Sequence, residues 1–139
     1  MTRPTPAFAP FPSGRPRRLR RDEFTRNLVR EHALSSHDLI YPVFVQEGSQ
    51  RRDAVPSMPG VERLSLDLLL PVAEDCVMLG IPVMALFPVI DPKLKTPGGD
   101  EAFNPDGLIP RVVAALKDRF PELGVMTDVA LDPYTSHGQ

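Results

Sequence analysis

The feature of this sequence that most constrains its fold is the order of its apolar segments after residue 34. Three short runs rich in apolar and β-branched residues, at 39–45, 83–89 and 125–131, have the length of buried strands. Between them lie two segments with the apolar spacing of helices, at 65–79 and 108–120. Buried strands that alternate with helices predict an α/β fold with a parallel sheet and right-handed crossover connections.

The connections between these elements are unequal in length. The segments after the first two strands, 46–64 and 90–106, are long and polar, whereas the joins from helix to strand, 80–82 and 121–124, are short. This asymmetry is typical of a (β/α)8 TIM barrel, whose active site is built from the loops after the strands. A flavodoxin-like sheet is the alternative, although neither strand-to-helix junction carries a glycine-rich nucleotide fingerprint. Three strands cannot close a barrel of eight, so we expect an incomplete barrel.

Two prolines fall near the predicted helix starts. Ser65 is the candidate N-cap of the first helix, but Pro71 would then stand inside that helix. We therefore expect the regular part of the helix to begin at about Leu70, which puts Pro71 in the first turn, where proline is tolerated. Pro110 fits the first turn of the second helix in the same way.

The beginning of the chain differs from the rest in composition. Residues 1–16 hold five prolines and no periodic pattern, whereas residues 17–33 lack glycine and proline and place apolar residues at helical spacing. We expect residues 1–34 to form an extended N-terminal oligomerisation arm with a short amphipathic helix. Residues 35–139 are then expected to form the partial (β/α)8 barrel.

Charge is distributed unevenly along the chain. Residues 1–30 contain eight arginines and two acidic residues, although the whole chain has a net charge of −2. A basic arm on an acidic body can bind nucleic acid, an anionic membrane or the acidic face of a sister subunit. The arginines stand beside Leu19, Phe24, Leu28 and Val29 rather than within glycine-rich loops. This pattern favours docking on a second subunit, and we expect neither nucleic acid nor membrane as a partner.

Cysteine content and hydropathy indicate the compartment. The single cysteine, Cys76, excludes an internal disulfide framework and is typical of a reducing cytoplasm. No apolar stretch approaches the roughly 18 residues that a membrane-spanning helix needs. We expect a cytoplasmic protein.

Two aspartates are the candidate site residues, one in the last predicted strand and one directly after it. Asp128 stands in the middle of an apolar run, where a carboxylate is costly unless it is paired or faces a cavity. It either faces a polar barrel interior or accepts structural hydrogen bonds. Asp132 lies at the carboxyl end of this strand, where barrel enzymes keep their reactive groups, and is a candidate for the substrate pocket. The alternative for Asp132 is a turn aspartate before Pro133.

The remaining reactive side chains are weaker candidates. His137 stands in a loop, where a histidine more often makes a loop hydrogen bond than it catalyses a reaction. A Schiff-base lysine needs a desolvated pocket that lowers its pKa. Lys93 and Lys95 fall in a long loop and Lys117 near a helix end, and we expect none of the three to be buried.

Several long motifs resemble one family in the same order along the chain. They are RPRRLRRDEFTRNLVRE in the arm, SMPGV at 57–61, LFPV at 86–89, and TDVALDPYTSHGQ at 127–139. Together these motifs resemble the porphobilinogen synthase (5-aminolevulinate dehydratase) family from about residue 14 to the last residue.

The resemblance implies a (β/α)8 barrel whose arm wraps a neighbouring subunit in a homo-oligomer, usually an octamer. It also implies the condensation of two 5-aminolevulinate molecules to porphobilinogen, with loss of water, in tetrapyrrole (heme) biosynthesis. Two lysines of the family form Schiff bases with the substrates, and both come from later strands, so the 139 residues alone are expected to be inactive. Asp128 is the position that carries over best to the active site.

The metal implied by the resemblance depends on two positions. Zinc-dependent members of the family have cysteines where this sequence has Ala130 and Asp132. An alanine cannot bind a metal, and a carboxylate is a hard oxygen ligand rather than a soft thiolate. We therefore expect no catalytic zinc and assign the chain to the magnesium-type branch, with the Mg²⁺ ligands mostly outside this segment.

Two other classes of function remain open from the sequence. The chain could be a non-catalytic oligomerisation module that keeps the arm and part of the sheet. A basic-armed nucleic-acid-binding α/β domain is the weaker alternative. The sequence after Gln139 would distinguish the enzyme from the module, because only the enzyme needs later strands that carry lysines.

Overall fold

The computed structural model describes residues 9–138, which divide into two compact units, one up to Leu34 and the other from Ser35. In the first unit, the segment predicted as one amphipathic helix forms two short helices, α1 (Arg18–Arg21) and α2 (Glu23–Leu28). The break falls at Asp22, whose backbone is extended. Neither helix buries a residue, so no packing within this unit joins them into one longer helix.

The second unit is built on one sheet with the strand order β2-β3-β1-β4-β5. Strands β3, β1, β4 and β5 run parallel, and β2 pairs antiparallel with β3. The elements, in chain order, are η1 (Ser36–Asp38), β1 (Ile40–Gln46), β2 (Arg52–Ala54), β3 (Glu62–Leu64), α3 (Leu66–Met78), β4 (Val83–Val89), η2 (Pro92–Leu94), η3 (Asp100–Phe103), α4 (Leu108–Arg119) and β5 (Gly124–Thr127).

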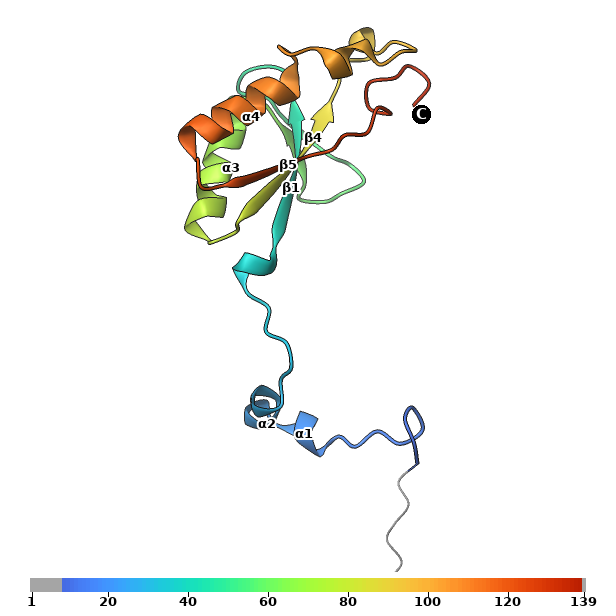
Figure 1. Cartoon of the computed structure of the whole chain (residues 1–139), viewed down its shortest axis with the longest axis vertical. Coiled ribbons are helices and arrows are strands. Elements are labelled where there is room, and N and C mark those ends of the chain that lie inside the picture. Colours follow the sequence, from blue (N-terminus) through green and yellow to red (C-terminus); the bar gives the residue numbers. More distant parts are fainter. Residues whose placement is uncertain (1–8, 139) are drawn as a thin grey trace, which may run out of the picture. The chain divides into compact units, whose positions relative to one another are not determined.

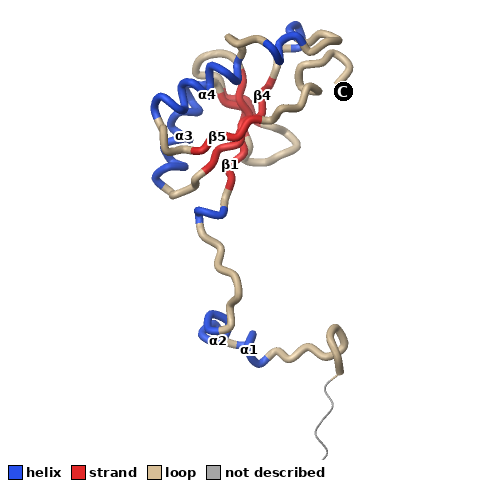
Figure 2. Tube along the Cα trace, viewed as in Figure 1, coloured by secondary structure: helices blue, strands red, loops and turns tan. Residues whose placement is uncertain are grey.

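Both long helices, α3 and α4, lie on the same face of the sheet (Figures 1 and 2). Alternate residues of the two central strands point at them and form the core with the inner faces of the helices. Burying one such aliphatic side chain contributes about 1.5–3 kcal/mol. The members of this core with the least exposure are Val45, Leu69, Ala73, Met84, Leu86, Val112, Leu116 and Leu123.

The face of the sheet that the helices do not cover carries the remaining residues of the same strands, those that do not point at the helices. Phe44 of β1 is paired in register with Phe87 of β4, and their ring centroids lie 6.1 Å apart. Met126 of β5 continues this face and is 48% exposed. A parallel sheet whose helices all cover one face, with apolar side chains on the other, is the arrangement of a (β/α)8 barrel wall. The predicted fold class, an arm followed by the first part of such a barrel, is confirmed.

The boundaries of the main elements agree closely with the sequence. The second predicted strand is β4 without change, the first is shifted by one residue in β1, and the second helix, α4, ends one residue early. The segment 46–64 was predicted as a polar loop, and this was wrong in part, because it contains β2 and β3. These strands have three residues each, and no period is visible in so short a polar run.

The first helix begins earlier than predicted. It starts at Leu66 rather than near Leu70, and Pro71 lies inside it. The backbone N–H groups of Leu68 and Leu69 already bond to the Ser65 carbonyl, so the turn before the proline is helical. The proline removes one hydrogen bond, but the stripe that contains Leu69 and Ala73 is fully buried against the sheet. Packing outweighs the local preference.

The third strand is shorter than predicted. It ends at Thr127, so Asp128 lies beyond the strand and not in the middle of it. The carbonyl of Pro82 accepts from the Gly124 N–H at 2.8 Å, and bonding directions alternate along a parallel strand. The backbone N–H and C=O groups of the even-numbered residues of β4 therefore point toward β5. Pro88 is one of these residues, and it has no N–H to continue the hydrogen-bond ladder past Thr127.

Candidate active site at the carboxyl ends of the strands

The loops that follow β4 and β5 are joined at the carboxyl end of the sheet. Thr96 and Thr135 form an isolated parallel bridge. The Thr96 N–H donates to the Tyr134 carbonyl at 3.3 Å, and the Ser136 N–H donates to the Thr96 carbonyl at 3.0 Å. Thr135 is buried, although it lies in a loop. The bridge fixes the segment that contains both candidate aspartates against the preceding loop.

Asp128 is the first residue after β5, and its side chain is exposed. Its Oδ1 accepts a hydrogen bond from the Ala130 N–H at 3.1 Å. In the alternation of β5, Met126 belongs to the face away from the helices, and Asp128 follows it by two residues. The carboxylate therefore stands at the carboxyl end of the strand, where a barrel keeps its reactive groups, with one oxygen fixed by the backbone.

Tyr134 lies near both Asp128 and Glu101, and the sequence revealed neither of these proximities. Burial raises the pKa of the half-buried Tyr134 phenol, and the negative charges of Glu101 and Asp128 raise this pKa further. The Glu101 carboxylate is itself held by the Asn104 side-chain amide, which lies 3.2 and 3.1 Å from its two oxygens. Glu101 and Asp128 come from separate loops, and no periodic pattern relates two such positions.

Asp132 lies in the turn that closes this loop. The turn is formed by the Tyr134 N–H, which donates to the Leu131 carbonyl at 2.9 Å. The Asp132 side chain is exposed, and within residues 9–138 no hydrogen bond links it to Asp128. The turn matches the structural alternative for Asp132, a turn aspartate before Pro133.

His137 has the geometry of a loop hydrogen-bonder, since its Nε2 lies 3.2 Å from the Pro97 carbonyl oxygen. Lys117 donates from Nζ to the carbonyls of Pro121 and Leu123, at 2.7 and 2.8 Å, and so closes the end of α4. Lys93 is exposed. None of the three lysines is buried, as expected, although Lys95 is half-buried.

Lys95 borders an open cavity of about 260 Å³ on the face of the sheet that carries Phe44. A second basic residue, Arg63 of β3, also lines this cavity and is paired in register with Phe44. The sequence did not indicate Arg63, because β3 was not predicted. The remaining lining residues are apolar, and they are Phe44, Val55, Pro88, Val89, Ile90 and Pro133.

The metal implied by the resemblance can be compared with the side chains present. In the described part of the chain, no three His, Cys, Asp or Glu side chains converge into a group that could hold a metal ion. Ala130 and Asp132 do not form such a group with Asp128. The described side chains therefore do not form a complete metal site, and no chemical step is assigned to a metal ion here.

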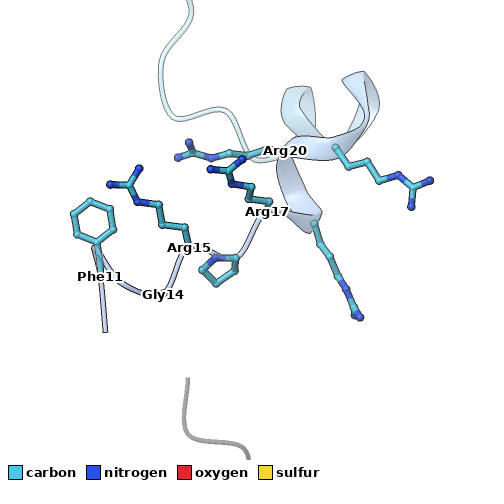
Figure 3. A pocket seen from close by; sticks show the side chains of 8 residues that line it. Phe11, Gly14, Arg15, Arg17 and Arg20 are labelled. Carbon is cyan, nitrogen blue, oxygen red and sulfur yellow. The ribbon is translucent and has the colours of Figure 1, made fainter. Parts of the chain in front are cut away.

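The first unit carries a separate cluster of basic side chains, which we call the arginine cluster. The Arg15 guanidinium lies 5.5 Å from the centroid of the Phe11 ring, a cation–π contact. Figure 3 shows Arg15, Arg17 and Arg20 around one hollow, with Phe11 at its edge. The cluster comprises Arg15, Arg17, Arg18, Arg20 and Arg21.

No helix among residues 9–138 is long and apolar enough to cross a bilayer.

Parallel strands with helices on one face, and polar loops gathered at the strand carboxyl ends, define a segment of a β/α-barrel protein. The family model described as delta-aminolevulinic acid dehydratase matches residues 13–139. The chain belongs to this family, as the resemblance predicted.

Individual relatives agree with the family match. The chain is 52% identical over 124 residues to the delta-aminolevulinic acid dehydratase of Bradyrhizobium diazoefficiens, covering 89% of this chain and 35% of the relative. It is 43% identical over 136 residues to the chloroplastic enzyme of Physcomitrium patens, covering 96% of this chain and 31% of the relative. The chain thus spans about a third of the length of the curated relatives it matches.

A solved structure gives the same result. The Toxoplasma gondii delta-aminolevulinic acid dehydratase (porphobilinogen synthase), in complex with the reaction product porphobilinogen, has 44% sequence identity and a TM-score of 0.82. The match covers 88% of this chain and 35% of that chain.

Proposed function

We propose that the protein to which these residues belong is a porphobilinogen synthase, which condenses two 5-aminolevulinate molecules to porphobilinogen with loss of water. The observation that carries this proposal is the family match over residues 13–139. The relative solved with porphobilinogen, at 44% identity, supports the same activity. In this protein the segment would supply part of the barrel wall and one carboxylate of the site.

Asp128 is the proposed catalytic residue within the segment. Its Oδ1 is oriented by the Ala130 N–H, which leaves the second carboxylate oxygen open to the carboxyl end of the sheet. A carboxylate fixed in this way can hold a substrate ammonium or accept and return a proton. Asp132 is proposed to border the substrate pocket. The lysines that form Schiff bases are assigned to other parts of the protein.

We propose Mg²⁺ rather than catalytic zinc as the metal of this protein. The support is chemical: Ala130 and Asp132 stand where zinc-dependent members have cysteines, and Mg²⁺ prefers oxygen ligands. Most of the Mg²⁺ ligands are assigned to residues outside this segment.

The arm is proposed to dock on another copy of the chain in a homo-oligomer, with an octamer as the expected size, in the cytoplasm. Its support is the exposed apolar surface of the first unit, which stands beside the arginine cluster. Phe24, Leu28 and Leu34 are 72%, 84% and 81% exposed. A partner surface that is acidic and apolar would cover both kinds of side chain. A non-catalytic oligomerisation module would use the same arm.

The activity is tested with the protein expressed from its natural coding sequence, including any that follows Gln139. We expect purified protein to form porphobilinogen from 5-aminolevulinate, and Asp128→Asn to lower kcat at least 100-fold, the lower end of a general acid–base contribution. Asp118→Asn, an exposed change at the end of α4, is the matched control and should keep normal turnover. A folded protein that forms no product would favour the oligomerisation module. Salt-sensitive DNA binding would favour the nucleic-acid alternative.

A further inference from the structure

The loop that begins at Asp128 is held to the loop after β4 by backbone and side-chain contacts. The backbone contacts are the two hydrogen bonds of the Thr96–Thr135 bridge. The side-chain contact joins residues 40 positions apart, since Nε2 of His137 lies 3.2 Å from the carbonyl oxygen of Pro97. A substitution of His137 can remove this contact while the backbone bonds of the bridge stay in place.

The chemistry of the two atoms fixes the direction of this hydrogen bond. A backbone carbonyl oxygen only accepts, so a hydrogen bond between the two atoms requires the proton on Nε2 of His137. The Nε2–H group exists in one neutral tautomer of the imidazole as well as in the imidazolium, so the bond does not require a charged ring. A glutamine side chain carries an amide N–H donor and can place it at a similar distance from the backbone.

The turn that presents the Pro97 carbonyl is fixed by its own hydrogen bonds. The Gly99 N–H donates to the Thr96 carbonyl at 3.2 Å, and the Asp100 N–H donates to Thr96 Oγ1 at 3.1 Å. The proline ring restricts φ at the centre of this turn. His137, by contrast, lies in an exposed stretch of its loop. The contact therefore restrains the loop of His137 against a rigid partner.

The restrained loop leads back to the candidate carboxylate through successive turns. The Tyr134 N–H donates to the Leu131 carbonyl at 2.9 Å, and the Ala130 N–H donates to Asp128 Oδ1 at 3.1 Å. A shift of the end of the loop that carries His137 is therefore transmitted along bonded backbone to Asp128.

We propose that His137 is a positioning residue for Asp128, acting through the hydrogen bond that it donates to the Pro97 carbonyl. The proposal rests on the proposed function, because a kinetic effect is expected only if the Asp128 carboxylate takes part in the reaction. His137 needs no contact with the substrate in this role. A displacement of about 1 Å at a reacting group can lower a rate about 100-fold, so a loosened loop has a measurable effect on kcat.

The test compares two substitutions of His137 in the protein expressed from its natural coding sequence. His137→Met removes the donor and should lower kcat about tenfold, whereas His137→Gln keeps a donor and should stay within about twofold of the unmodified protein. His37→Met, the same change at an exposed histidine before β1, is the matched control and should keep normal turnover. Equal impairment of His137→Met and His137→Gln would refute the role of the hydrogen bond.

The same substitution in an Asp128→Asn background separates positioning from a loss of stability. If His137 acts through Asp128, His137→Met should change the residual kcat of Asp128→Asn by less than about twofold, because the carboxylate that it positions is absent. A tenfold loss in both backgrounds would mean that His137 acts independently of Asp128, and would overturn the proposal.

Hydrogen exchange tests the contact without turnover. Loss of one exposed hydrogen bond should speed exchange at the Thr96 and Ser136 amides about 2- to 12-fold in His137→Met, and His137→Gln should leave it unchanged. Unchanged exchange in His137→Met contradicts the restraint. An unmodified, folded protein that forms no porphobilinogen would refute the proposed function, whereas normal turnover in His137→Met would refute this proposal alone.

Discussion

Replacing Gly99 tests whether the loop after β4 holds the Asp128 loop in place. Gly99 is buried and has φ +68°, a conformation that costs a residue with a side chain about 1–2 kcal/mol. An added Cβ would lie 3.5 Å from Thr135 Cγ2 and 3.8 Å from Tyr134 Cβ, which is ordinary contact. Gly99→Ala therefore adds backbone strain without a clash, at the point where the two loops meet.

The strain should appear as easier opening of the Thr96–Thr135 bridge. A cost of 1–2 kcal/mol corresponds to about 5- to 30-fold faster hydrogen exchange at amides that exchange through that local opening. We expect this acceleration at the amides of Thr96 and Ser136, which donate across the bridge, as measured by hydrogen exchange with NMR or mass spectrometry.

Gly60→Ala is the matched control for this prediction. Gly60 has φ +84° and no atom within 4 Å of an added Cβ, so it carries a similar strain in the β2–β3 hairpin. Its substitution should leave exchange at Thr96 and Ser136 unchanged. If Gly99→Ala also leaves these amides unchanged while lowering overall stability, the two loops are not held together as described.

Two further predictions concern stability and pH. Leu116→Ala, at a core position with no exposed surface, should lower the free energy of unfolding in urea by about 2–5 kcal/mol. Leu94→Ala, at a position 45% exposed, should lower it much less. Equal losses in the two variants would refute the packing of α4 on the sheet. The pKa of Tyr134 is raised above its ordinary value of 10.0, so above that pH the unfolded chain loses the phenol proton before the folded protein does. Stability should therefore fall as pH rises through 10, and Tyr134→Phe should remove this part of the loss in denaturation curves at pH 9–11; an identical slope in the variant would contradict the burial of the phenol.

The sequence predicted the layers of the fold better than the details of its loops. β4 and α4 follow from apolar runs and helical spacing, because each buries one face against the other. The start of α3 was missed because Pro71 is a local signal, whereas the burial of Leu69 and Ala73 depends on the assembled sheet. The end of β5 depends on Pro88 of a neighbouring strand, which no pattern within 125–131 reveals.

The site divides in the same way. Asp128 was proposed as a candidate because a carboxylate in an apolar run requires an explanation, and the structure places it directly after β5. Tyr134, Glu101 and Arg63 were not found, because their positions depend on contacts between loops and on a strand of only three residues. The family motif identified residues 127–139 as the segment of interest. The structure adds which residues of other segments contact it or lie near it, among them Thr96 and Glu101.

The most direct test of the central claim is to locate the covalent adduct that borohydride traps between 5-aminolevulinate and the protein expressed from its natural coding sequence. Asp128 belongs to this segment, and the Schiff-base lysines are assigned to later strands. Mass spectrometry of the digested protein should therefore find the adduct on a lysine outside residues 1–139. An adduct on Lys93, Lys95 or Lys117, or a folded protein that forms none, would contradict it.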